Sequence, residues 1–307
     1  MNPKSPEARN SDEKPFEGMN ISNASALDAL KSRSACPKCG KSRMYFCYTC
    51  FLPVTELKDR IPICNLPIKV DIIKHRREID GKSTAAHAAV LAPNDVNVYT
   101  YPDIPNYELD NHTVLLFPGT EAQTVPELFA ANGNSIPYTE CILSELPHGY
   151  NVGTLMKKIV WDVNSPRDIY HVNKLPIDRV VLIDSTWNQA RGIFANEKLQ
   201  KLPKIVLQTR ASQFWRHQKG SPRWYLSTIE ALHQLLLELH MCAWGRSENY
   251  LSHLTMDYSI HEADNHQHCI PYQGQYDNLL FFFKYMYEKL HSLYKHEDLL
   301  AYKRHMI

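Results

Sequence analysis

Short apolar runs alternate with longer amphipathic stretches along most of the chain. The β-branched or alternating runs typical of strands occupy five segments, which are residues 66–74, 95–101, 112–117, 179–184 and 204–209. Apolar residues recur every three or four positions over residues 229–239 and 279–293, the spacing of helices with one buried face. Strands that alternate with helices favour an α/β fold with a largely parallel sheet.

Polar pairs predict where three helices begin. A Ser or Thr followed three residues later by Gln or Glu forms a capping box, which satisfies free amides at a helix N-terminus. The pairs are Thr120 with Gln123, Thr186 with Gln189, and Ser227 with Glu230. The first pair predicts a helix that continues through Leu128 and Phe129.

Composition divides the chain into an N-terminal tail, a small module and one large domain. Residues 1–30 are polar and predict a mobile tail, residues 31–66 contain a cysteine cluster, and residues 67–307 carry the strand and helix pattern. Within the large domain, residues 133–178 are rich in Pro, Asn and Gly and indicate an insertion. A C-terminal docking helix is expected over residues 278–303.

The charge balance excludes a protein that is basic throughout. Lys and Arg total 34 and Asp and Glu total 33 in 307 residues, so a site for a polyanion must come from local clustering. No apolar run is long enough to span a membrane, and no secretory signal is visible. We therefore expect an intracellular protein whose eight cysteines are reduced. No pattern indicates an obligate protein partner.

Four cysteines form two C-x-x-C pairs that are separated by seven residues. The residues are Cys36, Cys39, Cys47 and Cys50. Four thiolates close a tetrahedral zinc site with no open position, which indicates a structural and not a catalytic metal. The alternative is a set of free thiols; redox activity is expected of a single pair and hardly of two pairs so close together.

Two basic segments contain interleaved aromatic residues and predict contacts with RNA, because cations neutralise phosphates and rings stack on unpaired bases. Residues 31–50 lack acidic residues and offer Lys38 and Arg43, although a merely solvated face is the alternative there. Residues 201–225 contain six cations and no carboxylate. The candidate RNA-binding residues of this second segment are Trp215, Arg216, Lys219 and Arg223.

Asp184 comes at the end of the most strongly apolar strand, residues 179–184. Ligands of open α/β sheets bind beyond the carboxyl ends of the strands, so this carboxylate is a candidate general base or hydroxyl acceptor. The alternative is that Asp184 caps the following helix. Thr186 already supplies a capping box, which makes that role less necessary.

Several spaced motifs resemble one known family. Asp184-Ser185-Thr186-Trp187 matches the D-x-T-W signature of the DTW-domain proteins. The supporting motifs are Ser83-Thr84-Ala85, Leu116-Phe117-Pro118-Gly119, Thr209-Arg210 and Leu226-Ser227-Thr228-Ile229-Glu230-Ala231. Residues 214–220 and 274–278 further resemble a eukaryotic branch of tRNA-uridine aminocarboxypropyltransferases. The resemblance spans residues 33–290.

The resemblance implies both a reaction and a fold. The family transfers the 3-amino-3-carboxypropyl group of S-adenosylmethionine to N3 of a tRNA uridine, here a D-loop uridine at position 20, to give acp3U. The fold would be SPOUT-like, with a C-terminal trefoil knot that forms the cofactor pocket. Nuclear residence is favoured by the resemblance, and the cytosol is the alternative.

The resemblance also assigns roles to residues of this chain. The catalytic residues would be Asp184, Thr186 and Trp187. The cofactor-binding residues would be Leu116, Phe117, Pro118, Gly119, Thr209, Arg210, Leu226, Ser227 and Thr228. Two other functions remain open: an RNA base methyltransferase that holds the same donor in a rotated position, and a zinc-containing RNA-binding adaptor without activity.

Overall fold

The computed structural model describes most of the chain. The described residues are 14–108, 112–119, 121–130, 139–144, 156–161, 169–170, 172–218, 221–255 and 270–304. Within these residues, no helix is both long and apolar enough to cross a membrane.

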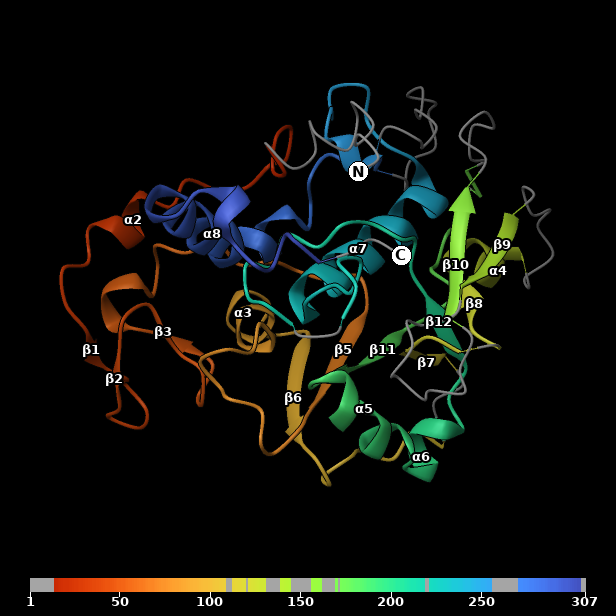
Figure 1. Cartoon of the computed structure of the whole chain (residues 1–307), viewed down its shortest axis with the longest axis horizontal. Helices are drawn as coiled ribbons and strands as arrows, with labels where there is room; N and C mark the ends of the chain where they lie inside the picture. The colour runs from red at the N-terminus through yellow and green to blue at the C-terminus, as the bar shows by residue number, and fades with distance from the viewer. Residues whose placement is uncertain are drawn as a thin grey trace.

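A six-stranded parallel sheet forms the centre of the protein (Figure 1). Its strands, in spatial order, are β6 (Val96–Thr100), β5 (Lys69–Lys74), β11 (Arg179–Asp184), β7 (Thr113–Leu116), β12 (Lys204–Val206) and β8 (Gln123–Thr124). Every neighbouring pair is parallel, and β11 and β5 pair along six residues. The predicted α/β class and parallel sheet are confirmed. The knot that the resemblance implies stays a prediction.

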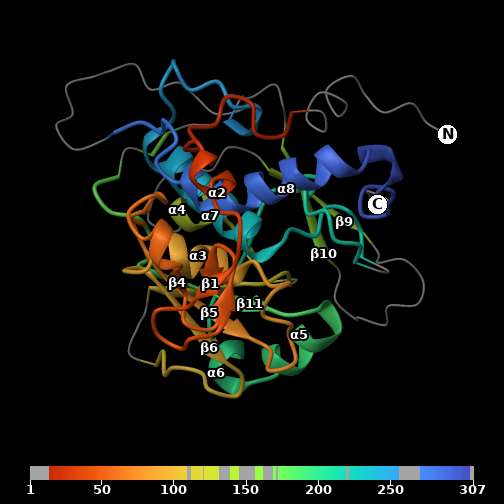
Figure 2. The same ribbon diagram turned by 90° about the vertical axis from the view of Figure 1, so that its left-hand side faces the viewer.

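Helices cover both faces of this sheet, which explains why the central strand β11 is apolar at every position between its two ends. Val180 and Leu182 of β11 face the large core built with α3 (Ala85–Leu91), α4 (Val125–Ala130) and α7 (Thr228–Trp244). Val181 faces a smaller core with α5 (Trp187–Phe194) and α6 (Glu197–Gln200). Figure 2 shows α7 and α3 above the sheet and α6 below it.

Two of the predicted helix starts are confirmed. Thr186 with Gln189 and Ser227 with Glu230 form capping boxes at α5 and α7. The third prediction is wrong, because α4 begins at Val125. The Thr124 amide donates to the Glu127 carboxylate at 2.6 Å and the Glu127 amide donates to the Thr124 hydroxyl at 3.2 Å, so this later pair caps the helix.

The described part of the N-terminal tail is packed, which corrects the prediction for residues 14–30. Leu27, in the short helix α2 (Ser25–Asp28), is completely buried. The Asn20 amide donates to a carboxylate oxygen of Asp277 at 2.7 Å, and the Ser22 amide donates to Asn278 at 2.8 Å. These contacts order a polar segment, and the one from Asn20 also gives the buried Asp277 carboxylate a partner. Residues 1–13 lie outside the described part.

The cysteine module, residues 31–66, is built from two small antiparallel pairs. β1 (Ser34–Ala35) pairs with β2 (Ser42–Arg43), and β3 (Phe46–Cys47) pairs with β4 (Leu52–Pro53). A 3-10 turn, Thr55–Leu57, follows. The Phe46 ring lies 5.5 Å from His87 in α3 and 4.6 Å from Phe282, so the module packs on the sheet domain through an aromatic contact.

The C-terminal helix is shorter than predicted. A 3-10 turn, Asp277–Leu280, leads into α8 (Phe281–Leu293), whose first three phenylalanines are fully buried. The helix ends at Leu293. Tyr294 is extended, and the chain then turns through the 3-10 segment His296–Asp298. This return stacks His296 on Tyr302, with ring centroids 3.9 Å apart.

The predicted insertion, residues 133–178, contains an antiparallel hairpin. Its strands are β9 (Thr139–Ser144) and β10 (Met156–Trp161). At its end, Leu175 and Ile177 are buried and lead directly into β11. A last 3-10 turn, His253–Thr255, lies after α7.

Candidate active site

A cavity of about 730 Å³ lies at the carboxyl ends of β7, β11 and β12. This is the edge at which open α/β sheets bind ligands, and the volume is typical of a small-molecule site. Seven of the nine predicted cofactor-binding residues line it: Leu116, Phe117, Pro118, Thr209, Leu226, Ser227 and Thr228. Gly119 and Arg210 do not. Arg210 is instead half-buried and donates to the backbone carbonyl of Glu230 in α7 at 3.3 Å.

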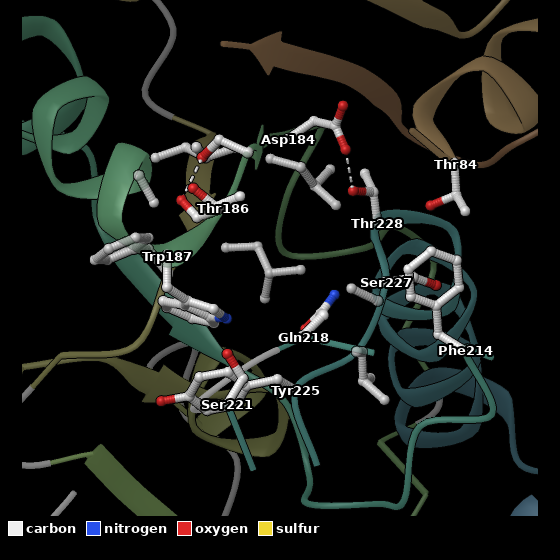
Figure 3. A pocket seen from close by; sticks show the side chains of 18 of the residues that line it. Thr84, Asp184, Thr186, Trp187, Phe214, Gln218, Ser221, Tyr225, Ser227 and Thr228 are labelled. Atoms are coloured by element: carbon white, nitrogen blue, oxygen red, sulfur yellow. Dashed lines mark hydrogen bonds between the residues drawn. The ribbon is translucent and has the colours of Figure 1, made fainter. Parts of the chain in front are cut away.

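Asp184 lines this cavity as the last residue of the central strand β11, and only 5% of it is exposed. The Ser83 hydroxyl donates to one carboxylate oxygen at 2.6 Å. The Thr228 hydroxyl donates to the other at 2.5 Å (Figure 3). The carboxylate therefore joins the loop before α3 to the start of α7. Burial raises the pKa of Asp184, and the two hydroxyls and Lys74 offset only part of that rise.

Thr186 and Trp187 also line the cavity, on the side of α5. The Thr186 side chain is held by its capping box, so it fixes the start of α5. The Trp187 ring is partly exposed and packs between Tyr225, at 4.3 Å, and Phe117, at 6.2 Å. Figure 3 shows Trp187 and Tyr225 together across the cavity from Thr84 and Phe214. This arrangement offers an aromatic wall to a planar ligand.

Sequence reasoning missed one acidic residue of the cavity. Glu78 lies in the loop that follows β5, and it lines the same cavity as Asp184. Burial raises the pKa of Glu78, and the negative charge of Asp184 raises it further. The signal was available, because this loop also leaves the carboxyl edge of the parallel sheet. Lys82 from the same loop, Gln218, Ser221 and Tyr225 were missed as well.

The candidate RNA-binding residues of the second basic segment fall into two groups. Arg216 lines the cavity and donates to the backbone carbonyl of Gly81 at 3.3 Å, and Trp215 lies beside it against Phe283. Arg223 is only 3% exposed and lies over the Tyr302 ring, so it does not present its charge at the surface. Lys219 lies outside the described residues.

The two candidate RNA-binding residues of the first basic segment also differ in exposure. Lys38 is exposed between Cys36 and Cys39. Arg43 is buried, and its guanidinium donates to the sulfur of Cys47 at 3.5 Å and to the Tyr48 hydroxyl at 2.9 Å. The structure therefore gives Arg43 a place in the cysteine cluster and not at an RNA-facing surface.

The four predicted metal ligands converge. The sulfur atoms of Cys36, Cys39, Cys47 and Cys50 all lie within 4.8 Å of one another. The Cys39 and Cys47 sulfurs are 3.7 Å apart, which agrees with the edge of about 3.8 Å expected for a tetrahedron with metal–sulfur bonds of about 2.3 Å. The donor set and its spacing thus fit a zinc ion.

Hydrogen bonds favour the thiolate form at two of the four cysteines, Cys36 and Cys47, whereas burial and the neighbouring sulfurs raise the pKa of Cys50. Backbone amides of Lys38 and Cys39 donate to the Cys36 sulfur, and those of Thr49 and Cys50 donate to the Cys47 sulfur. Burial raises the pKa of Cys47, but Arg43 and these amides outweigh it and lower the pKa to about 6. The thiolate is the form that binds metals.

Together these features define an α/β protein with a small-molecule cavity at the carboxyl edge of a parallel sheet and a module in which four cysteine sulfurs converge. A family model for the DTW domain matches residues 44–291, which include the whole sheet, the cavity and nearly all of α8. The chain belongs to the DTW domain family.

Full-length relatives are similar over nearly the whole chain. The chain is 39% identical over 286 residues to a "tRNA-uridine aminocarboxypropyltransferase 1" of Xenopus tropicalis, a match that covers 91% of this chain and 87% of the relative. It is 37% identical over 282 residues to the human protein of the same name, with 90% and 84% covered. No solved structure matches significantly.

Proposed function

We propose that this protein transfers the 3-amino-3-carboxypropyl group of S-adenosylmethionine to N3 of a tRNA uridine, a D-loop uridine at position 20. The observation that carries the proposal is the buried Asp184 carboxylate, which lines one cavity together with most of the predicted cofactor-binding residues and two cations, Lys82 and Arg216. The names of the relatives support the same reaction.

The cavity suits S-adenosylmethionine in size and chemistry. Leu116, Leu207 and Leu226 provide apolar surface, while Thr209 and Ser227 provide polar groups. Bound there, the donor supplies a sulfonium that makes its attached carbons electrophilic. The residues of the cavity decide which carbon reacts, because only the carbon in line with the nucleophile is attacked. Orientation of the donor therefore separates aminocarboxypropyl transfer from methyl transfer.

Asp184 is the proposed general base. Uridine N3 carries a proton and is a poor nucleophile until that proton is lost. The raised pKa of Asp184 improves its match to a proton acceptor near neutral pH. The new bond forms between N3 and the transferred carbon as the carbon–sulfur bond breaks, and the nucleoside thioether leaves. Ser83 and Thr228 hold the carboxylate in place for this step.

The pH dependence of transfer tests this role. The carboxylate must be unprotonated to act, so activity is expected to fall as the pH is lowered. Because the pKa of Asp184 is raised, this fall should have its midpoint above the ordinary Asp value of 3.8. Thr228→Val removes a hydroxyl that stabilises the charged form, so the pKa of Asp184 rises and the acid limb of the rate profile moves to higher pH. Single-turnover rates between pH 5 and 9 measure this. Thr209→Val, which lines the cavity without touching Asp184, should leave the limb in place.

The target uridine must be unpaired, since N3 lies on the Watson–Crick edge. Trp187 and Tyr225 are placed to stack on the exposed base, and Arg216 is placed to contact its phosphate. These placements make tRNA the proposed partner of the cavity's two cations, Lys82 and Arg216.

Arg216→Ala is expected to weaken tRNA binding and to reduce the slope of log affinity against log salt by about one. Fluorescence anisotropy with labelled tRNA from 50 to 300 mM salt measures both effects. Lys174→Ala removes an exposed cation near the opposite edge of the sheet, where it pairs with Asp178, and should change neither. An unaltered slope in the Arg216 variant would place the RNA elsewhere.

The cysteine cluster is proposed to hold a structural zinc ion. The residues that would bind it are Cys36, Cys39, Cys47 and Cys50, and their four sulfurs leave no position for a substrate. The metal would fix the fold of residues 31–66 against the sheet domain.

One labelling experiment distinguishes the proposed reaction from its alternatives. Donor labelled in the carboxyl group is supplied in one reaction and donor labelled in the methyl group in another, and label on tRNA is counted. Carboxyl label alone is expected, followed by mapping of the modified nucleotide by mass spectrometry. Methyl label on the tRNA would identify a methyltransferase. A protein that does not bind the donor would be an RNA-binding adaptor.

A further inference from the structure

A second, smaller cavity lies between the cysteine module and the sheet domain. Its volume is about 230 Å³, below the range of about 300–1,000 Å³ for drug-sized ligands, so its size suits a single ring system. It shares Lys82, Ser83, Thr84, Phe214 and Arg216 with the first cavity. The two cavities are therefore neighbours that are separated by one wall of side chains.

The lining of the second cavity combines cations with flat or polarisable side chains. Arg33 and Tyr45 come from the cysteine module, whereas Trp215 and Met286 come from the sheet domain. Trp215 is partly exposed, and its ring packs on Phe283 at 5.0 Å. The acidic residue of the lining, Asp80, is already paired with Lys74.

His87 gives independent evidence of a ligand in this cavity. The residue lines the cavity, is only 4% exposed, and its Nδ1 atom has no hydrogen-bond partner within the described residues. Burial, and to a smaller degree the charge of Arg216, lower the pKa of His87 to about 3, so the ring is neutral. A buried ring nitrogen without a partner is costly, and a polar ligand edge would satisfy it.

We propose that the second cavity binds the base of one unpaired nucleotide that adjoins the target uridine. The wall that both cavities share carries two cations, Lys82 and Arg216, so the phosphate that joins the two nucleotides would cross between them. Trp215 and Tyr45 would contact the faces of the base, and His87 would bond its edge. This inference rests on the proposed function, because it takes the first cavity as the site of the target uridine.

An abasic scan of the substrate tests the proposal. Full-length tRNAs are prepared in which each D-loop nucleotide in turn lacks its base, and their affinities are measured by anisotropy without donor. For the wild-type protein, we expect losses of about tenfold at two neighbouring positions, one for each cavity. In the His87→Phe and Trp215→Leu variants, the second base has no contacts left to lose. Removal of the target base should therefore still lower the affinity, whereas removal of the neighbouring base should not.

The controls separate this proposal from general damage and from failure of the proposed function. His112→Phe, an exposed histidine outside both cavities, should keep both losses. Donor affinity and melting temperature of each variant report whether it is folded. A single sensitive position in the wild type, or two unchanged losses in both cavity variants, would overturn the second subsite even if transfer occurs. Two sensitive positions without any transfer would leave the subsite standing and remove the proposed reaction.

Discussion

Asp184→Asn is expected to lower the rate of transfer about 10²–10⁴-fold while donor affinity stays nearly unchanged, since that is the usual contribution of a general base. Asn has the same shape as Asp, and its amide can still engage the hydroxyls of Ser83 and Thr228. The fold around β11 should therefore persist. Single-turnover transfer of carboxyl-labelled donor gives the rate, and calorimetric titration gives the affinity.

The control for this variant is Asp103→Asn, which alters an exposed carboxylate outside the cavity and should behave as wild type. A rate within threefold of wild type for Asp184→Asn would remove Asp184 from proton transfer. Glu78, the other acidic residue of the cavity, would then be the next candidate, and Glu78→Gln would be measured in the same assay.

Loss of the proposed zinc ion is expected to unfold residues 31–66, because structural zinc contributes about 10–16 kcal/mol of apparent folding free energy in small zinc peptides. Unfolding this module exposes Phe46, which packs on His87 and Phe282. Loss of one such aromatic contact costs about 3–5 kcal/mol, so we expect the melting temperature to fall by about 10 °C. Chelation or Cys47→Ser should produce the same result, measured by calorimetry together with the zinc content.

Cys242→Ala provides the comparison, since Cys242 is buried in α7 outside the cluster and its loss should leave one zinc ion per chain. A wild-type protein purified without metal, with an unchanged melting temperature after chelation, would contradict the proposed zinc site. Residual transfer by the Cys47→Ser protein would be informative as well, because a structural metal does not take part in the reaction itself.

The sheet and the position of the cavity could be predicted because local patterns determine them. The run Arg179–Asp184 is apolar at every position except its two ends. A continuous apolar run of this kind is typical of a strand that is covered on both faces. The capping boxes at Thr186 and Ser227 specify helix starts through contacts three residues apart. A carboxylate after a central parallel strand must lie at the ligand-binding edge. These inferences need only neighbouring residues and the rules of sheet packing.

The errors arose where distant residues determine the environment. Arg43, Arg210 and Arg223 are cations in basic segments, yet Arg43 and Arg223 are buried and Arg210 is half-buried. Each finds partners that the sequence does not show: a cysteine sulfur, a helix carbonyl and a tyrosine ring, respectively. The charge of a segment thus predicts an electrostatic surface only when its side chains remain exposed, and exposure is a property of the folded chain.

The contact between Asn20 and Asp277 has a consequence for synthesis of the protein, since 257 positions separate the two residues. The partner of the N-terminal segment is therefore translated long after the segment itself. Similarly, the aromatic contact of Phe46 in the cysteine module can form only after Phe282 has been translated. The N-terminal segment and the cysteine module are therefore translated well before their partners, and until those partners emerge their apolar side chains stay exposed to chaperones and proteases.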